Sequence, residues 1–206
     1  YTGLLFHWDG RTMDESSMVA IRELFTGRAD VIVRRWSLSP RTSENMYPWP
    51  LENVGNGKVA QMEGLLGLQV ADNGFLEPMP IISGGRFFSS DSAQEALVMA
   101  TTAAALGITP ENLGECRVKF LGQEFAVVGI LDDERFRKIK DLDDLSILPI
   151  KQTLSSQGAG AQAQAPVGMV AEAVTEAGVL YADTSGVLVI PEKTSYKLHA
   201  RPYSTS

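Results

Sequence analysis

The chain has 206 residues, of which 44% are apolar and 21% are charged, and its formal net charge is −7. A chain of this size and composition can bury a core without disulfides, which argues against disorder over its whole length. The acidic balance disfavours nucleic acid or an anionic membrane surface as a partner, because both attract basic faces. No apolar run reaches the ~18–20 residues of a membrane helix. The chain opens at Tyr1 without an initiator Met, so we expect a piece of a longer protein.

The first third of the chain alternates apolar segments with turn-forming residues. Residues 1–8 favour a strand or a docking arm, and the spacing of apolar residues predicts a helix over 14–26, begun by Asp14 and ended by Gly27. A β-branched run predicts a strand over 29–37. Prolines and glycines then predict a loop over 39–56, followed by a strand over 58–70 in which Gly64 and Gly67 mark bulges or close approaches.

The middle of the chain carries the clearest patterns. Ala96–Ala100 predicts a short buried strand, and Thr101 or Thr102 is expected to cap an alanine-rich helix ending at Gly107. A turn is expected at 110–114. Alternation over 116–120 and 124–130 predicts a hairpin whose two-residue loop, Gly122-Gln123, suits a type II′ turn. Acidic residues followed by basic ones predict a helix over 132–139, with an acidic loop at 141–144.

The last third is less regular. The Ala- and Gln-rich run at 157–166 has no side chains able to build a core and predicts a mobile loop over 155–166. Residues 167–182 fit a helix or a strand. Gly186–Ile190 predicts a buried strand, Pro191 opens a one-turn helix, and Tyr203–Ser206 favours the start of another strand.

Residues with catalytic or ligating chemistry are scarce, and we assign no catalytic, cofactor-binding or metal-binding residue. His7 and His199 lie near opposite ends of the chain, and two imidazoles without an acid cluster make a poor metal site. Cys116 has no base or electropositive neighbour in the sequence, so an inert, buried thiol is the better interpretation.

Three patterns that suggest ligand loops fail on spacing. Gly55–Lys58 resembles part of a phosphate loop, but Glu52 and Val59 stand where that loop needs Gly and Ser or Thr. Gly158-Ala-Gly160 has no strand before it and does not indicate a dinucleotide site. The acidic residues do not match a calcium-binding loop and favour a solvated helix with its flanking loop; they are Asp132, Asp133, Glu134, Asp141, Asp143 and Asp144.

An ordered set of short motifs covers about 84–194. It comprises Gly84-Gly-Arg-Phe-Phe-Ser89, Ala96-Leu-Val-Met99, Ala104-Ala-Leu-Gly107, Leu113-Gly114, Val118–Gly122 with Phe125–Ile130, and Val187-Leu-Val-Ile-Pro191-Glu-Lys-Thr194. Together and in this order they resemble the periplasmic core domain of MacB-like permeases, which is related to the LolC/LolE and FtsX permeases. The Ala/Gln-rich region and the acidic stretch within 132–182 depart from the family's pattern, so the cargo of its members is not transferred.

The resemblance implies an α+β fold with two parts. Residues 1–83 would form the first part of a porter-like subdomain, 84–202 an inserted strand-rich subdomain with the hairpin, and 203–206 the strand returning to the porter-like part. It also implies a non-catalytic role, because in this family ATP hydrolysis belongs to a separate nucleotide-binding domain or subunit. The extracytoplasmic domain would couple ATP-driven motion of the membrane helices to substrate or partner handling.

The expected location is therefore the cell membrane, with this domain facing the periplasm or the extracellular side. The expected partners are the cognate ATP-binding subunit, a second permease copy and an extracytoplasmic adaptor or carrier protein, with no nucleic acid and no cofactor. Two alternatives stay open. A free-standing extracellular ligand- or protein-binding module would have a groove and no flanking membrane helices, and a hydrolase would bring His7 or His199 close to a carboxylate and a hydroxyl.

Overall fold

The structure, a computed structural model, describes residues 15–28, 31–40, 46–75, 78–141, 144–153 and 179–199. Its class is α+β, as the sequence predicts. The strands are β1 (Arg35–Leu38), β2 (Trp49–Asn53), β3 (Val59–Met62), β4 (Gly64–Leu68), β5 (Glu95–Met99), β6 (Arg117–Phe120), β7 (Gln123–Leu131), β8 (Ile150–Thr153), β9 (Val179–Tyr181) and β10 (Val187–Pro191). The helices are α1 (Glu15–Phe25), α2 (Asp72–Phe75), α3 (Ala100–Leu106), α4 (Asp133–Arg137) and α5 (Glu192–His199), and short 3-10 turns lie at η1 (Pro110–Asn112) and η3 (Thr184–Gly186).

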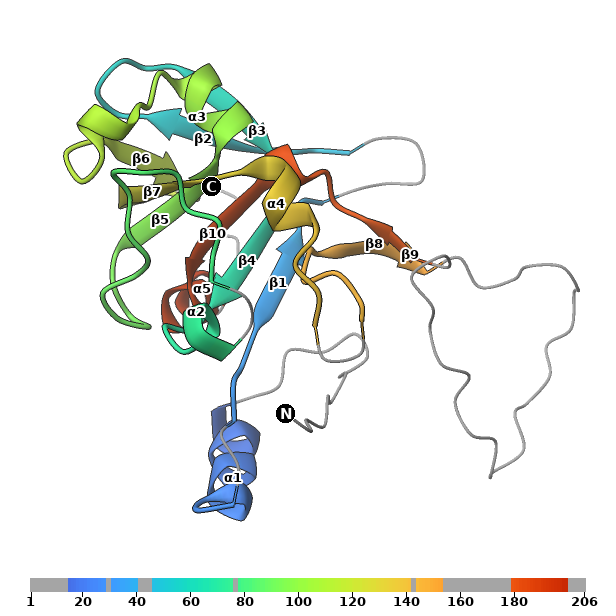
Figure 1. Ribbon diagram of the computed structural model, residues 1–206. Coiled ribbons are helices and arrows are strands. Elements are labelled where there is room, and N and C mark those ends of the chain that lie inside the picture. The colour runs from blue at the N-terminus through green and yellow to red at the C-terminus, as the bar shows by residue number, and fades with distance from the viewer. Residues whose placement is uncertain are drawn as a thin grey trace, which may run out of the picture.

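One mixed sheet contains eight of these strands, in the order β1-β4-β10-β5-β7-β6-β2-β3, and β8 pairs with β9 separately (Figure 1). Only Glu63 separates β3, at one edge, from β4, one strand in from the other edge. Because consecutive Cα atoms lie only about 3.8 Å apart, the sheet must curve until its β3 edge returns to β4. The Glu63 amide donates to the Gly186 carbonyl at 2.7 Å, and the Glu63 carbonyl accepts from the Ser39 amide at 2.8 Å, which fixes this bend.

Each face of the curved sheet carries its own apolar core. The inner core draws on β2 to β7 and β10 and on α3 and α5, as expected for a concave face; it includes Leu51, Met62, Leu65, Leu106, Phe120, Phe125, Leu188 and Leu198. The outer core lies under α4 and the loops beside it; it includes Leu66, Leu68, Leu97, Met99, Phe136, Ile147 and Val189. Burying one such side chain stabilises the fold by about 1.5–3 kcal/mol.

The predicted hairpin is confirmed, but its turn is of another type. β6 and β7 pair from Arg117↔Ala126 to Phe120↔Gln123, so the two-residue loop is Leu121-Gly122 rather than Gly122-Gln123. Both loop residues have positive φ, 46° and 77°, as in a type I′ turn. The prediction of a type II′ turn is therefore wrong, because it did not allow for a leucine in the left-handed region.

Two predictions in the first third are corrected. The expected loop over 39–56 contains β2, whose residues alternate between buried and exposed. Pro50 pairs with Gln61 of β3 and lies just beyond the end of the ladder to β6, which begins at Leu51, a position where a proline is tolerated. The expected single strand over 58–70 is two strands, broken at the Glu63 bend.

The close approaches expected in β4 do occur. A Cβ on Gly64 would lie 3.1 Å from the Pro149 ring, and a Cβ on Gly67 would lie 2.8 Å from the Ser195 Cβ of α5.

The predicted helices form, with corrected ends. Neither Thr101 nor Thr102 caps α3; its N-cap is Met99, and the Thr102 hydroxyl bonds the Ser185 carbonyl instead. Gly107 ends α3 in the left-handed conformation, as expected. α4 is shorter than 132–139 and is capped by Asp132, and α5 extends to eight residues where one turn was predicted.

A strand was predicted over 29–37, of which the structure describes 31–37. The observed strand, β1, begins only at Arg35, and residues 31–34 are not strand. Gly27 has φ +71° just after α1, in agreement with the predicted stop. The ambiguous segment 167–182 ends in β9, and 179–182 is the only part of it that the structure describes.

Other predictions lie outside the described residues: the arm at 1–8, the cap at Asp14, the mobile loop at 155–166 and the strand at 203–206. The division of the chain at residue 83 stays a prediction, and strands from both sides of that boundary share the one sheet. Within the described ranges, no helix combines the length and apolar character that crossing a membrane requires.

Candidate functional site

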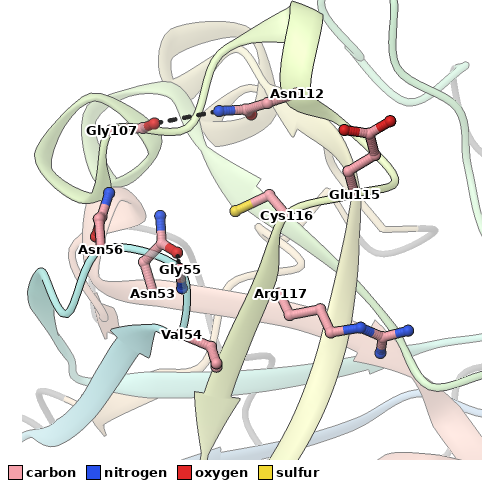
Figure 2. A pocket seen from close by; sticks show the side chains of 9 residues that line it. All are labelled: Asn53, Val54, Gly55, Asn56, Gly107, Asn112, Glu115, Cys116 and Arg117. Atoms are coloured by element: carbon pink, nitrogen blue, oxygen red, sulfur yellow. Dashed lines mark hydrogen bonds between the residues drawn. The ribbon is translucent and has the colours of Figure 1, made fainter.

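One hollow in the described structure lies where α3 ends against the β2–β3 turn (Figure 2). Its volume is about 420 Å³, and its lining comes from three loops; the lining residues are Asn53, Val54, Gly55, Asn56, Gly107, Asn112, Glu115, Cys116 and Arg117. Figure 2 shows the three asparagines around Gly107, with Glu115 and Arg117 pointing away from them.

The amide groups of this hollow are used to close the end of α3. Asn53 and Asn56 both donate from Nδ2 to the Leu106 carbonyl at 2.9 Å, and Asn112 donates to the Gly107 carbonyl at 3.3 Å. The last carbonyls of a helix have no partner within it, so side-chain donors satisfy them. These asparagines therefore act first as a cap for α3.

Cys116 lies half-buried at the same hollow, immediately before β6. Burial raises the pKa of its thiol, which lowers the fraction of reactive thiolate at neutral pH. Its side chain also packs against the inner core. The geometry thus favours a packing role, although the thiol is less buried than the sequence suggested.

A second, smaller hollow of about 200 Å³ lies beside β3 and η3. Its two carboxylates are already engaged. Glu63 pairs with Lys151 at 2.5 Å, and Asp183 accepts from the Ser185 amide at 2.9 Å and the Ser185 hydroxyl at 2.7 Å. These bonds from Ser185 hold the pKa of Asp183 below its ordinary value, so this acid stays ionised and is no general acid near neutral pH.

The two most buried charged residues in the described structure, Asp72 and Glu192, pair with the adjacent arginines Arg34 and Arg35 where the chain enters β1. Arg34 donates from Nε to Asp72 Oδ1 and from a terminal nitrogen to Asp141 Oδ2, both at 2.6 Å. Asp72 is fully buried, and its second oxygen accepts the Gln69 amide at 2.8 Å. Gln69 in turn accepts the Val33 amide at 2.9 Å. Arg34 therefore joins three segments of the chain that are distant in sequence.

Arg35, the first residue of β1, makes a similar connection to α5. Its Nε lies 2.5 Å from Glu192 Oε1 at the start of α5, and its guanidinium lies 4.5 Å from the centre of the Tyr196 ring. We call the two arginines with their acceptors Asp72, Asp141 and Glu192 the arginine clamp.

Burial and charge oppose each other within the clamp. Burial by itself lowers the pKa of Arg34, because it disfavours the charged form. The carboxylates of Asp72 and Asp141 more than offset this effect and hold the pKa of the guanidinium above its ordinary value. Burial raises the pKa of Asp72, and Arg34 offsets only part of that rise. A pair of this kind contributes little net stability while intact, yet it is costly to leave half-broken.

The patterns that suggested ligand loops have structural roles here. Gly55–Lys58 forms the β2–β3 turn, in which the Gly57 amide bonds the Asn53 carbonyl at 2.8 Å, and a strand follows where a phosphate loop needs a helix. Asp132 caps α4, Asp133 accepts the Thr101 amide at 3.2 Å, and Asp141 belongs to the clamp.

The remaining candidates cannot be placed together. His7, Asp143, Gly158 and Gly160 lie outside the described residues, as does the side chain of His199. Among the side chains that are described, no group of three His, Cys, Asp or Glu residues could hold a metal ion.

Sequence reasoning missed the arginine clamp. A signal existed in the adjacent Arg34-Arg35, which directly follows the apolar run Val31-Ile-Val33, because a charge held beside an apolar segment needs a partner. The partners lie 38, 107 and 157 residues away in the sequence, beyond the reach of local patterns.

No family model, no curated protein and no solved structure matches the chain.

Proposed function

We propose that this chain is the extracytoplasmic domain of an ABC transporter permease related to MacB and FtsX. In this proposal the domain is not catalytic. It carries ATP-driven motion of the membrane helices to a substrate or a partner outside the membrane, and the finer fold is that of the MacB periplasmic core domain.

The observation that supports this proposal most is the place of the family-like motifs. They are spread over more than a hundred residues, yet four of the six occupy β5, α3, the β6–β7 hairpin and β10 with the start of α5, and the other two lie in connecting segments. β10, β5, β7 and β6 are consecutive neighbours in the sheet. Motifs that form one contiguous unit are more specific than the same motifs scattered over a surface.

The mechanical role also needs a body that moves as one piece. Apolar cores on both faces of the sheet supply that rigidity, since well-packed interiors resist deformation. The bend at Glu63 ties the two ends of the sheet together.

The non-catalytic part of the proposal is supported by how polar groups are used in the two hollows. The asparagines cap α3, and Glu63 and Asp183 bond Lys151 and Ser185. A nucleophile next to a free base is the usual mark of a catalytic site, and these five side chains are already committed to structural bonds. ATP hydrolysis would reside in the separate ATP-binding subunit, and a second permease copy and an adaptor or carrier protein would complete the assembly in the cell membrane.

The gene that encodes this chain provides the first test. The proposal expects one membrane helix before Tyr1 and about three after the domain, each of ~20 apolar residues. A signal peptide with no later membrane helix would overturn it and favour a secreted binding module.

A biochemical test follows on the full-length protein purified with its ATP-binding partner. The complex should hydrolyse ATP, whereas the isolated domain should show no turnover. Activity in the isolated domain would contradict the non-catalytic assignment.

A further inference from the structure

β1, at one edge of the sheet, buries less apolar surface than β2, which lies next to the other edge. It is an edge strand of four residues and pairs only with β4. None of its residues is fully buried, and Trp36 is 42% exposed. By contrast β2, whose partner β3 forms the opposite edge, places Trp49 and Leu51 in the inner core.

Besides its ladder to β4, this segment is attached to the fold by charged bonds. Arg34 reaches Asp72 and Asp141, and Arg35 reaches Glu192 and Tyr196. The Val33 amide adds its bond to Gln69. The acceptors sit on the body of the fold, in or beside α2, after α4 and in α5.

The helix that precedes this segment in the chain is α1. Figure 1 shows α1 extending away from the sheet at the end of the segment that leads into β1. None of the other described helices or strands packs extensively against α1. A movement of α1 would therefore reach the sheet first through residues 31–38.

We propose that residues 31–38 form a strap, held by the arginine clamp, that can leave β4 as a unit while the rest of the sheet stays folded. Opening the strap returns the clamp's charges to water, which offsets much of the cost of breaking the ion pairs. It exposes the edge of β4 and leaves the packing of β10, β5 and β7 in place, so its opening free energy lies below that of global unfolding.

This proposal goes beyond the proposed function and does not depend on it. Under that function, the strap lies on the N-terminal side of the domain, where motion from a preceding membrane helix would enter. The strap would then set how tightly such motion is coupled to the sheet.

Native-state hydrogen exchange followed by mass spectrometry tests the strap. In the unchanged chain, peptides covering 31–38 should exchange at least about tenfold faster than peptides covering β2 or β7, as local opening allows. Arg34→Met should speed exchange in 31–38 by about another tenfold and change β7 by less than about twofold, because it removes the ion pairs to Asp72 and Asp141 from the strap. Arg86→Met removes an exposed ion pair with Glu95 elsewhere in the chain and should leave 31–38 unchanged.

Equal exchange rates in 31–38 and β7, or a uniform acceleration by Arg34→Met, would overturn the proposal. If Arg34→Met fails to fold, the unchanged chain still decides the question through its urea dependence. Strap opening exposes little surface, so exchange in 31–38 should depend on urea far less steeply than exchange in β7. The same steep dependence in both segments would mean that β1 opens only when the whole fold does.

Discussion

The contact between β4 and α5 gives the sharpest test of the packing. A Cβ added at Gly67 would lie 2.8 Å from the Ser195 Cβ, 3.0 Å from the Ser195 hydroxyl and 3.3 Å from the Glu192 Cα. Carbon atoms pack best at about 3.5–4.0 Å, so α5 would have to move by roughly 0.7 Å or more. Such overpacking costs about 1–3 kcal/mol, and the loss of glycine's freedom in the unfolded chain returns about 0.4–1 kcal/mol.

We therefore expect Gly67→Ala to destabilise the fold by about 1–2 kcal/mol, which lowers Tm by about 2–8 °C in a chain of this size. Urea and thermal unfolding, followed by tryptophan fluorescence and circular dichroism, measure both values. Gly74→Ala is the matched control, because no atom lies within 4 Å of its added Cβ and α2 is helical there. That control should be neutral or stabilising by about 0.5–1 kcal/mol.

A double-mutant cycle isolates the clash itself. Ser195→Gly removes the atom nearest to the new Cβ, so Gly67→Ala should cost at least about 1 kcal/mol less in that background. If Gly67→Ala matches Gly74→Ala in stability, or if the cycle shows no coupling, the close packing of α5 on β4 is refuted.

Three further predictions concern a turn, a cap and an acid. Leu121→Asn should be more stable than Leu121→Ala by about 0.5–1 kcal/mol, because both lose the packing of Leu121 on the inner core and φ of +46° suits asparagine better than alanine; equal Tm values for the two variants would contradict the type I′ turn. Asp132→Ala should cost about 1 kcal/mol by removing the cap of α4, measured by urea unfolding, whereas Asp132→Asn should cost much less. Burial opposes ionisation of Glu95, but bonds from Arg86 and Ser89 outweigh it and hold the pKa of Glu95 below its ordinary value of 4.5. The stabilising contribution of ionised Glu95 is thus present above pH 4.5 and is lost as the pH falls through the lowered pKa. Glu95→Gln should therefore flatten the pH dependence of the urea midpoint in that window. An unchanged slope would refute the stabilising pair of Glu95 with Arg86.

Local patterns predicted those parts of the fold that local physics decides. Alternation of apolar residues located the β6–β7 hairpin, and Gly107 marked the end of α3 because only glycine adopts that left-handed cap readily. The strands β5 and β10 were evident as short apolar runs, since a strand buried on both faces needs no polar alternation.

Tertiary contacts decided the rest. β2 was hidden by Pro48 and Pro50, and the burial of Trp49 and Leu51 in the inner core outweighs those turn signals. The break between β3 and β4 at Glu63 depends on the curvature of the whole sheet, which no window of a few residues contains.

The arginine clamp could not be located from sequence for a similar reason. Arg34 is visible as a charge beside a strand, but its acceptors Asp72 and Asp141 become partners only when the loops after β4 and after α4 meet.

The sequence analysis assigned no catalytic residue, and this stays a prediction that activity assays must test.

The central claim is that this domain lies outside the membrane of a permease, and topology labelling of the full-length protein in intact cells tests it most directly. Val54 is 45% exposed on the β2–β3 turn, so Val54→Cys, in a chain carrying Cys116→Ser, presents a single reactive thiol within the domain. A membrane-impermeant maleimide should label this thiol in intact cells, or in cells with a permeabilised outer membrane, without lysis. Labelling only after the inner membrane is broken would place the domain on the cytoplasmic side and contradict the proposed function.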